Sequence, residues 1–574
     1  MEHFSAVIIG SGFGGSVMAY RLAEAGLNVC VLERGKPYPP GSFPRSPNKM
    51  KSNFWDPSKG LYGLFNFWSF RGIAAVISSG LGGGSLIYAN VLIRKDEKWF
   101  VQEDLSKGGY EYWPINRQDL DPHYDLVEKM LKAEKYPLDH HPYSTTPKTN
   151  ALKQAAEILN LDWYLPNLAV TFGNAGRTPV PGEYIQEEHR NLHDRDRYTC
   201  KLCGECDVGC NYGSKNTLDY NYLSEAKRLQ ADIRTLCEVR SFEPREGGGY
   251  LIHYVQHDLE REGKPYKTSE LPLITISTDK LILAAGTIGS TYLLLRNRSA
   301  FPHISPRLGT RFGGNGDLIT FATRASTTKD GVRTPRTMDG SYGPVITSTI
   351  RVADQLDGAQ GRGFYLQDAG YPDFVNWMLE LFQAPSVFWQ QRLFLTRLIC
   401  SFVQGTGPVD SDLSGEISQL FGSTELSSGL LPLLGMGRDI PDGVMSLRQG
   451  LLDVNWTKKN SEPFFNRLLE TMQQVAGVWD AKLIDNPTWY LGRTIAAHPL
   501  GGCPMGRNES EGVVDAWGEV FNYPGLIIAD GSVLPGPVGA NPSLTIAALA
   551  NRFADRVIDK HQSIRGSVTR SNHL

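Results

Sequence analysis

The hydrophobic pattern at the start of the chain predicts a strand, a helix and a second strand. The short apolar run at residues 6–9 is typical of a strand that is buried on both faces. Apolar residues at helical spacing follow, and that pattern ends at Gly26. A second apolar run, residues 28–32, predicts another strand that ends at Glu33. Together these segments predict one βαβ unit.

A glycine-rich turn joins the first predicted strand to the helix. Residues 10–15 read GSGFGG, with glycines at the first, third and sixth places of G-x-G-x-x-G. Gly10 permits the tight turn, Gly12 lets the backbone approach a pyrophosphate, and Gly15 lets the helix pack closely on the strand. Glu33 lies about 20 residues further on, where an acid accepts hydrogen bonds from ribose hydroxyls. The pattern therefore predicts a dinucleotide site, with phosphates at the helix N-terminus; a glycine-rich turn of an ordinary α/β protein is the alternative.

A second glycine cluster lies at residues 80–86, which read GLGGGSL. Three consecutive glycines leave a bare backbone whose N–H groups can wrap an anion or lie against a flat ring. A flexible turn is the alternative, but the first motif favours contact with the cofactor. Residues 281–295 repeat the pattern of an apolar strand, a small-residue turn and a helix. This repetition predicts that part of residues 200–320 belongs to the first domain.

The middle of the chain, residues 320–485, has a different pattern of apolar residues. Short apolar stretches predict strands at 347–353 and 363–366. Residues 374–402 are strongly apolar and aromatic, but Pro385 interrupts them, so they are too short and too broken to span a bilayer. They could form an amphipathic helix pair, a lid over an apolar cavity, an interfacial patch in peripheral contact with a membrane, or part of an ordinary core. An apolar substrate would account for these apolar residues.

Polar residues near the C-terminus are candidates for chemistry. His498 lies in the loop AHPLGGCPMG, whose Pro and Gly residues hold the imidazole on a constrained backbone rather than on an apolar helix face. That setting favours a functional histidine over one that fills the core. The sequence NPSLT opens a predicted helix, 544–556, and places Asn541 at its positive end. Asp530, after the apolar run 525–529, could accept from the sugar-like chain of a cofactor or cap the following turn.

Four cysteines are concentrated in one short stretch. They have the spacing C-x-x-C-x-x-C-x-x-x-C, and they are Cys200, Cys203, Cys206 and Cys210. This spacing matches the run that holds iron–sulfur clusters in bacterial ferredoxins, but Asn211 stands where that run has proline, and no second run supplies another cluster. The four cysteines, free or paired, are therefore expected to support a loop, and no metal site is predicted. A cluster bound by the four residues is the alternative.

Composition narrows the class of protein further. The chain has 574 residues, which suggests two or three domains on a prior of about 100–200 residues each. A formal net charge of −3 gives no reason to expect a nucleic-acid partner. No basic segment followed by an apolar one precedes the first strand, and no apolar run is long enough to span a bilayer, so neither a secretory signal nor a transmembrane helix is predicted. A reduced, cytoplasmic chain is the expectation.

These separated motifs together resemble those of the glucose–methanol–choline (GMC) oxidoreductases, which bind FAD. Five ordered stretches carry the resemblance: GSGFGG with Glu33, GLGGGSL at 80–86, AAGTIGS at 284–290, HPLGGC at 498–503, and ADGSVLPGPVGANPSLTIAALA at 529–550. The resemblance implies an α/β fold in which a Rossmann-like FAD-binding domain, with a doubly wound parallel sheet, adjoins a discontinuous α+β substrate-binding domain built on a mainly antiparallel sheet. The expected division gives residues 1–100, 200–320 and 486–574 to the FAD-binding domain and residues 101–199 and 321–485 to the substrate-binding domain.

Within this family the chain looks most like the cholesterol oxidase branch. There the histidine of HPLGG and the asparagine of the G-x-N-P stretch are the active-site pair, which implies catalytic roles for His498 and Asn541. One departure lies in YLQDAGYP, where Gln367 stands at the place of a catalytic glutamate. Glutamine cannot act as that base, although Asp368 is adjacent. Oxidation is therefore better supported than isomerisation.

The resemblance implies an FAD-dependent oxidoreductase that oxidises an apolar alcohol, sterol-like or otherwise hydrophobic, to a carbonyl by hydride transfer to flavin N5. His498 is the expected base, because imidazole ordinarily titrates close to neutral pH, and O2 or another acceptor would reoxidise the flavin. The alternative is an FAD/iron–sulfur electron-transfer dehydrogenase that uses the four cysteines. The expected cofactor-binding residues are Gly10, Gly12, Phe13, Gly14, Gly15, Glu33, Arg34, Gly82, Gly83, Gly84, Ser85, Val239, Ala285, Gly286, Asp530, Gly531, Asn541, Pro542 and Ser543.

Overall fold

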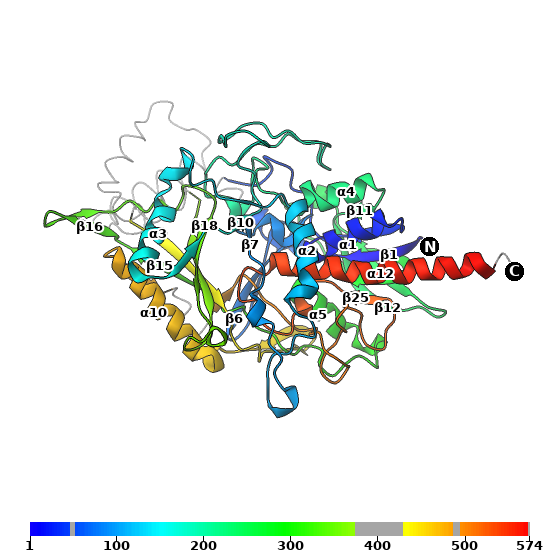
Figure 1. Cartoon of the computed structure of the whole chain (residues 1–574). Coiled ribbons are helices and arrows are strands. Elements are labelled where there is room, and N and C mark those ends of the chain that lie inside the picture. The colour runs from blue at the N-terminus through cyan, green and yellow to red at the C-terminus, as the bar shows by residue number, and fades with distance from the viewer. Residues whose placement is uncertain (46–51, 373–428, 486–493, 572–574) are drawn as a thin grey trace.

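The computed structural model describes residues 1–45, 52–372, 429–485 and 494–571 (Figure 1). The apolar segment 374–402, for which the sequence left four interpretations open, lies outside the described residues.

A seven-stranded sheet forms the first part of the fold. Its order is β11-β2-β1-β14-β13-β12, and β25 also pairs with β14. The pairings of β1 with β2 and β14, of β2 with β11, and of β14 with β25 are parallel, whereas β12 and β13 are antiparallel additions. The strands are β1 (His3–Ile9), β2 (Val29–Leu32), β11 (Asp232–Arg234), β12 (Cys237–Pro244), β13 (Tyr250–Gln256), β14 (Ile274–Leu283) and β25 (Leu526–Ile528).

The predicted βαβ unit is present at the N-terminus. Helix α1 (Phe13–Glu24) joins β1 to β2, and all four residues of β2 are buried, as expected of a strand covered on both faces. The predicted return to this sheet at 281–295 is confirmed, because β14 is followed by α5 (Gly286–Arg296). Strands that alternate with helices in this way build a doubly wound sheet.

The apolar pattern between residues 218 and 239 predicts one helix, 218–230, and one strand, 233–239, and both predictions are wrong in detail. The single strand expected at 233–239 is two strands, β11 and β12, because Leu236 between them has a left-handed backbone with φ of 59°. The single helix expected at 218–230 is a 3₁₀ turn, η8 (Leu218–Tyr220), followed by a short helix, α4 (Tyr222–Arg228). Asn221 separates them and accepts a hydrogen bond from the backbone N–H of Tyr222.

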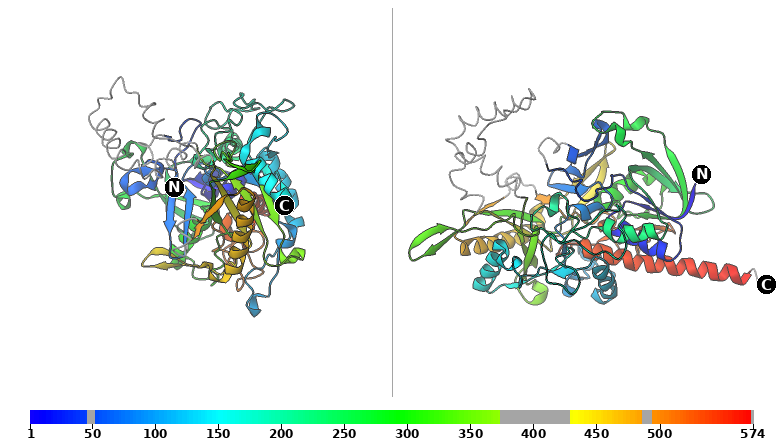
Figure 2. Two further views of the ribbon diagram at one scale, coloured as in Figure 1. Left: turned by 90° about the vertical axis from the view of Figure 1, so that its left-hand side faces the viewer. Right: turned by 90° about the horizontal axis from the view of Figure 1, so that it is seen from above.

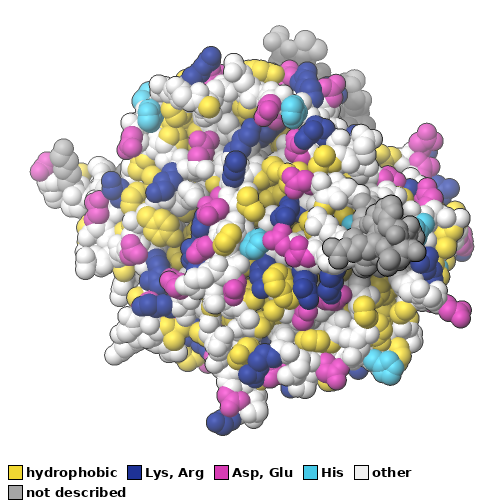
Figure 3. Space-filling view, turned by 45° about the vertical axis from the view of Figure 1, so that its right-hand side comes forward, with side chains coloured by type: hydrophobic (Ala, Val, Ile, Leu, Met, Phe, Trp, Pro, Cys, Tyr) yellow, Lys and Arg dark blue, Asp and Glu magenta, His cyan; other side chains and the backbone are white. Residues whose placement is uncertain are grey.

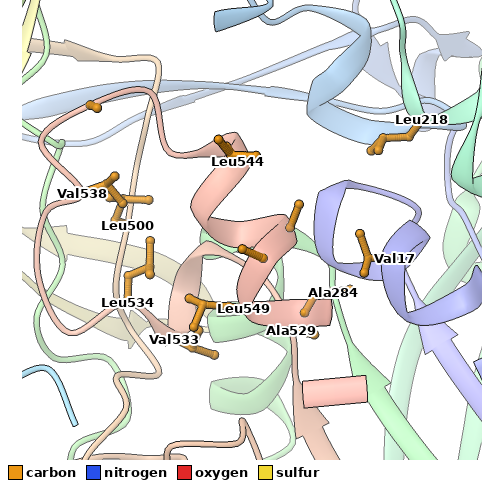
Figure 4. Packing of buried hydrophobic residues seen from close by; sticks show 14 of the residues in the cluster. Val17, Leu218, Ala284, Leu500, Ala529, Val533, Leu534, Val538, Leu544 and Leu549 are labelled. Atoms are coloured by element: carbon orange, nitrogen blue, oxygen red, sulfur yellow. The ribbon is translucent and has the colours of Figure 1, made fainter. Parts of the chain in front are cut away.

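The C-terminal helix α12 (Ser543–Ser571) packs against α1 and α2 (Arg117–Met130) and extends along one side of the molecule (Figures 1 and 2). Gly14 of α1 permits a very close approach, because a Cβ at this position would lie 1.4 Å from the carbonyl oxygen of Ala529. Val17, Ala284 and Leu549, from the start, middle and end of the chain, belong to one apolar cluster (Figure 4). The first and last segments of the chain therefore share a core.

A second sheet of six antiparallel strands forms the other part of the fold. Its order is β23-β15-β20-β19-β18-β9. Gly435 of β20 faces α10, because a Cβ there would lie 2.6 Å from Leu468. The elements are β9 (Asp162–Tyr164), β15 (Leu318–Thr323), β18 (Ile346–Val352), β19 (Phe364–Ala369), β20 (Leu431–Gly437), β23 (Lys482–Asp485), α3 (Pro147–Leu159) and α10 (Glu462–Val478).

The remaining strands form small sheets. The sheet β24-β6-β5 joins the segment before His498 to the segment before the second glycine cluster. These strands are β3 (Trp55–Asp56), β4 (Leu61–Tyr62), β5 (Phe65–Ser69), β6 (Ile73–Ser78), β7 (Val91–Leu92), β8 (Glu134–Lys135), β10 (Asn167–Leu168), β16 (Ser326–Lys329), β17 (Val332–Pro335), β21 (Val444–Arg448), β22 (Leu451–Asn455) and β24 (Thr494–Ala496).

Together, the largely parallel sheet and the antiparallel sheet confirm the predicted fold class. The residue limits of the two predicted domains stay a prediction. On the face shown in Figure 3, basic and acidic side chains are interspersed, without a field of one sign. Among the described residues, no helix is both long enough and apolar enough to cross a membrane.

Candidate active site

The turn between β1 and α1 has the close contacts that its glycines predict. Gly10 has φ of 98°, and a Cβ there would lie 2.4 Å from the carbonyl oxygen of Ala284. A Cβ on Gly15 would lie 2.0 Å from the carbonyl oxygen of Gly10, so the helix can sit on the turn only if this residue is glycine. Gly12 differs, because a Cβ there would meet no atom within 4 Å. Its backbone is therefore open to a ligand at the start of α1.

The second glycine cluster lies directly on the first. Gly82 and Gly83 have φ of 110° and 54°, and the 3₁₀ turn η3 (Gly83–Leu86) follows. A Cβ on Gly83 would lie 2.6 Å from the Cα of Gly12, and the backbone N–H of Gly82 donates to Ser11 Oγ at 3.0 Å. Gly84 is open, because a Cβ there would meet no atom within 4 Å. Two segments about 70 residues apart in sequence thus form one bare backbone wall.

Glu33, expected to bind a ribose, already has three partners within the chain. Its Oε2 accepts from the backbone N–H and the hydroxyl of Ser11, at 3.0 and 2.6 Å, and its Oε1 accepts from the N–H of Gly35 at 2.8 Å. A carboxylate oxygen can accept two hydrogen bonds, so Oε1 keeps one acceptor position. The ribose contact stays a prediction that this geometry allows.

Asp530 caps the turn that follows it, which is one of the two roles predicted for it. Its Oδ1 accepts from the N–H and hydroxyl of Ser532, at 2.9 and 2.6 Å, at the start of the 3₁₀ turn η15 (Gly531–Val533). Its Oδ2 accepts from the N–H of Gly286 at 3.0 Å, so the same carboxylate ties the C-terminal segment to the start of α5. Burial raises the pKa of this carboxyl group, and these hydrogen bonds oppose the rise.

The other predicted cofactor residues lie around the same edge of the parallel sheet or at the start of α12. Phe13 packs edge-on against Tyr88, with 5.3 Å between ring centroids, and Arg34 lies over the ring of Trp55 at 5.3 Å. Ala285 precedes α5, Val239 is buried in β12, and Pro542 and Ser543 begin α12, with the predicted Asn541 before them.

His498 is held by a buried carboxylate. The backbone N–H of His498 donates to Asp317 Oδ2 at 2.8 Å, and its ring Nδ1 lies 2.9 Å from Asp317 Oδ1. The Asp317 side chain is 2% exposed and the His498 side chain 18% exposed. A carboxylate at Nδ1 favours the tautomer in which Nδ1 carries the proton. In that tautomer, Nε2 is the ring nitrogen that can accept a hydrogen bond.

Asn541 is held by a different partner. Gln367 Nε2 donates to Asn541 Oδ1 at 2.8 Å, and both residues are buried. Because the Asn541 oxygen is engaged, its amide N–H groups are left to face a ligand. Gln367 thus stands beside one member of the predicted pair, where the sequence comparison placed it. Asp368 is directed elsewhere, since its carboxylate accepts from the backbone N–H groups of Thr347 and Ser348 at 3.0 and 2.7 Å.

One tight turn, residues 313–317, positions both members of the predicted pair. Its Asp317 binds His498, and its Asn315 donates to the carbonyl of Ala540 at 2.9 Å and accepts from the N–H of Gly539 at 2.8 Å. Gly313 exchanges two backbone hydrogen bonds with Leu500, at 3.1 and 3.0 Å. The imidazole loop and the loop before α12 are therefore fixed to the same few residues.

Several buried polar atoms in this region have no partner among the described residues. Both side-chain atoms of Asn90 are in this state, although Asn90 is fully buried and has φ of 69°. Gln367 Oε1 and Asp219 Oδ1 are unpaired too, and the latter lies 3.5 Å from where a Cβ on Gly82 would be. Unpaired buried polar groups are costly unless a ligand satisfies them. Bare glycine backbone beside unpaired donors and acceptors fits the phosphates and the polar ring edge of a flavin dinucleotide.

Sequence reasoning missed Asp317, Asn315 and Asn90. All three are short polar residues in glycine-rich or left-handed turns, and Asn90 and Asn315 have positive φ. The only signal was the polar turn GGNGD at 313–317, immediately before β15. Nothing in the local pattern shows that this turn reaches residues 498 and 539–541.

Comparison with known proteins finds matches at both ends of the chain. Residues 453–550 match the family model of GMC oxidoreductases, and residues 8–38 match that of NAD(P)-binding Rossmann-like domains. A cholesterol oxidase of Mycobacterium tuberculosis is 28% identical over 98% of this chain and 92% of its own length. One of Acinetobacter baumannii is 27% identical over 97% of this chain and 95% of its own length.

Two more distant proteins are similar to this chain, one in sequence and one in fold. A long-chain-alcohol oxidase of Arabidopsis thaliana is 22% identical over 97% of this chain and 68% of its own length. The crystal structure of pyridoxine 4-oxidase from Mesorbium loti has the same fold, with a TM-score of 0.54, 16% identity, and coverage of 96% of this chain and 98% of its own. These matches show that the chain is similar to the GMC oxidoreductases, including cholesterol oxidases, and they support an oxidoreductase that acts on alcohol CH–OH donors.

Proposed function

We propose that this enzyme binds FAD and oxidises the hydroxyl group of an apolar alcohol to a carbonyl, with O2 or another acceptor taking the electrons. The observation that carries the proposal is the pairing of His498 with Asp317 and of Asn541 with Gln367. The turn at 313–317 holds the loops that carry His498 and Asn541. FAD, when bound, supplies the hydride acceptor at flavin N5. The residues at 1–100, 200–320 and 486–574 would form its binding domain, and 101–199 and 321–485 the substrate domain.

His498 is the proposed base. Its Nε2 takes the hydroxyl proton while the substrate carbon loses hydride, and the Asp317 carboxylate stabilises the positive charge that then forms on the ring. Asp317 is a positioning residue, because its contacts are with His498 and not with the substrate. Asp317 also holds the imidazole in place before the reaction, because its Oδ1 contacts the ring and its Oδ2 accepts from the backbone N–H of His498.

Asn541 is the proposed partner for the same substrate oxygen. With its Oδ1 held by Gln367, its Nδ2 donates to the alcohol oxygen and keeps that oxygen facing His498. The start of α12, two residues later, adds the positive end of a helix dipole, which stabilises negative charge nearby. Gln367 orients Asn541 and has no ionisable proton, so a base for isomerisation is not placed at this position.

The face of the antiparallel sheet that carries Gln367 is apolar. Residues directly opposite in antiparallel strands point to the same face; Gln367 of β19 pairs with Leu434 of β20, which pairs with Ile319 of β15. Phe321, two residues further along β15, shares that face. Ile319 and Phe321 are only half-buried. The opposite face, with Thr320 and Gly435, packs against α10. An apolar wall next to Asn541 supports a hydrophobic alcohol as substrate.

The relatives point to the same substrate class. Their names include cholesterol oxidase and long-chain-alcohol oxidase, and both cholesterol and long-chain alcohols are apolar molecules with one hydroxyl group. This agreement supports the proposal without choosing between a sterol and a linear alcohol.

Anaerobic mixing of the purified holoenzyme with a panel of sterols, long-chain alcohols, aryl alcohols and sugars tests the proposal. We expect apolar alcohols to bleach the flavin absorbance and sugars to leave it unchanged. His498→Ala should keep its FAD, but alcohol should bleach that flavin about 10²-fold or more slowly, which is the usual contribution of general acid–base catalysis. The matched control is His189→Ala, which removes an exposed imidazole. Equal bleaching rates in the two variants would remove His498 from the mechanism.

A further inference from the structure

The four cysteines of the C-x-x-C-x-x-C-x-x-x-C stretch line a single pocket. Cys200, Cys203, Cys206 and Cys210 all line one small pocket, which Lys215 and Gly343 also line. In two-cluster ferredoxins the fourth cysteine of such a run serves a second cluster. Here all four cysteines line the same pocket, so the spacing and the fold agree on one site.

The thiols are not joined to one another. All four are free; Cys200 is buried and the other three are half-buried. The backbone N–H of Leu202 donates to Cys200 Sγ at 3.4 Å, and the N–H groups of Glu205 and Val345 donate to Cys203 and Cys206. Backbone donors directed at sulfur are a feature of sites in which the sulfur atoms carry negative charge.

A buried cation lies beside the same pocket. Lys215 is 1% exposed and forms none of the ion pairs in the described ranges of the chain. Its Nζ donates instead to the carbonyl oxygens of Leu86, Tyr88 and Cys206, at 2.9, 3.2 and 2.8 Å. A buried ammonium group held only by neutral carbonyls is costly unless negative charge lies close by. The carboxyl groups of Asp207 and Asp219 lie near Lys215, and thiolates at Cys206 and Cys210 would add to that charge.

The four cysteines are not arranged as a site for a single metal ion. No group of three or more His, Cys, Asp or Glu side chains in the described part of the chain converges closely enough to hold one metal ion. In an iron–sulfur cluster each cysteine binds a different iron atom, so its four ligands stand further apart than those of one zinc ion. We propose that Cys200, Cys203, Cys206 and Cys210 bind one [4Fe–4S] cluster.

The site adjoins the wall proposed to bind the flavin. The 3₁₀ turn η7 (Cys206–Val208) packs against η3, and Lys215 bridges the carbonyls of Leu86 and Cys206. The role that follows rests on the proposed function. Oxidation of one alcohol to a carbonyl releases two electrons and two protons. A cluster at this site would pass the electrons one at a time to two equivalents of an external one-electron acceptor, and the protons would pass to solvent.

The test uses the full-length holoenzyme, isolated without oxygen from cells supplied with iron. Iron and acid-labile sulfide are measured against FAD, together with the visible spectrum and the electron paramagnetic resonance spectrum after dithionite reduction. We expect about four iron and four sulfide per chain, absorbance beyond the flavin bands, and a signal from the reduced cluster. Cys206→Ala should lose most of the iron and the signal, whereas Cys237→Ala, which removes a buried thiol elsewhere, should keep both.

FAD content shows whether each variant is folded. If Cys206→Ala does not retain FAD, the cluster proposal is tested only by the iron, the sulfide and the spectra of the unaltered protein. The proposal is overturned if that protein holds no more than about one iron per chain after reconstitution with iron and sulfide, if it holds zinc instead, or if peptide mapping finds the four cysteines in disulfides. Flavin bleaching by alcohol is measured separately. If the cluster is absent but alcohol bleaches the flavin, only the cluster proposal fails. If the cluster is present but alcohol does not bleach the flavin, only the proposed alcohol oxidation fails.

Discussion

Replacing Asp317 by asparagine isolates the contribution of the carboxylate behind His498. The substitution keeps an oxygen that can accept from the backbone N–H of His498, now at 2.8 Å, so the loop should stay in place. It replaces the oxygen at Nδ1, now 2.9 Å away, by a neutral amide that can donate to the ring. The ring would then carry its proton on Nε2 and lose its acceptor position towards the substrate.

The size of the effect follows from the buried geometry. The Asp317 side chain is 2% exposed, so water does not replace the lost charge. A hydrogen bond to a charged group contributes about 1.5–3 kcal/mol, and each 1.36 kcal/mol in a barrier is a factor of ten. We therefore expect Asp317→Asn to bleach its flavin about 10- to 150-fold more slowly than the unaltered enzyme at saturating alcohol.

The assay is anaerobic stopped-flow absorbance of the flavin, with the dependence on alcohol concentration fitted for rate and affinity. The loss should fall on the rate and not on the apparent Kd, because Asp317 does not touch the substrate. Asp330→Asn is the matched control, since Asp330 is exposed in the β16–β17 turn. A full rate in Asp317→Asn, with normal FAD content and thermal midpoint, would refute the role given to this carboxylate.

Three further predictions test separate parts of the structure. Gln367→Leu frees the Asn541 oxygen and should slow flavin bleaching about tenfold, the value of one hydrogen bond of about 1–1.5 kcal/mol. In Gly12→Val the new Cβ meets no protein atom within 4 Å, so the protein should fold but bind FAD much more weakly. In Gly14→Ala the new Cβ would lie 1.4 Å from the carbonyl oxygen of Ala529, so this change should instead lower the thermal midpoint. Burial raises the pKa of Asp439 to about 7, so the folded state binds a proton more tightly than the unfolded one. Its contribution to stability should fall by up to about 1.4 kcal/mol per pH unit between pH 4 and 7.

Each of these predictions has its own contrary outcome. Bleaching at the normal rate by Gln367→Leu would mean that Asn541 needs no orienting partner. FAD titration showing tight binding to Gly12→Val would place the phosphates away from this turn. For Asp439, urea unfolding of the unaltered protein and Asp439→Asn at pH 5, 6 and 7 is compared. The difference between the two proteins should change with pH, because the variant lacks the titrating group, and a constant difference would contradict the prediction.

Local patterns predicted the parts of the fold that depend on neighbours in sequence. The strand–turn–helix at residues 6–24 and its return at 281–295 were readable, because buried strands and glycine turns leave a local signature. The single strand expected at 233–239 was wrong, because a left-handed residue, Leu236, splits it without any glycine or proline to mark the break. Backbone conformation at one ordinary residue is not visible in a hydrophobic pattern.

The site was predictable only in part for a similar reason. His498 and Asn541 stood in recognisable motifs, but the residue that holds the imidazole lies 181 positions away, and Asn315 lies 224 positions from Gly539. Contacts over such separations are set by how the two sheets pack and not by spacing along the chain. The cysteine spacing likewise left two interpretations open, because spacing alone does not show that four thiols face one pocket.

The central claim is that segments from the start, middle and end of the chain enclose one flavin, with His498 at its reacting edge. The most direct measurement is the anaerobic titration of the purified protein with an apolar alcohol, following flavin absorbance in the unaltered enzyme and in His498→Ala. The account predicts a yellow protein that is bleached by stoichiometric alcohol and a yellow variant that bleaches about 10²-fold or more slowly. A colourless protein that does not take up FAD, or two proteins that bleach at the same rate, would contradict it.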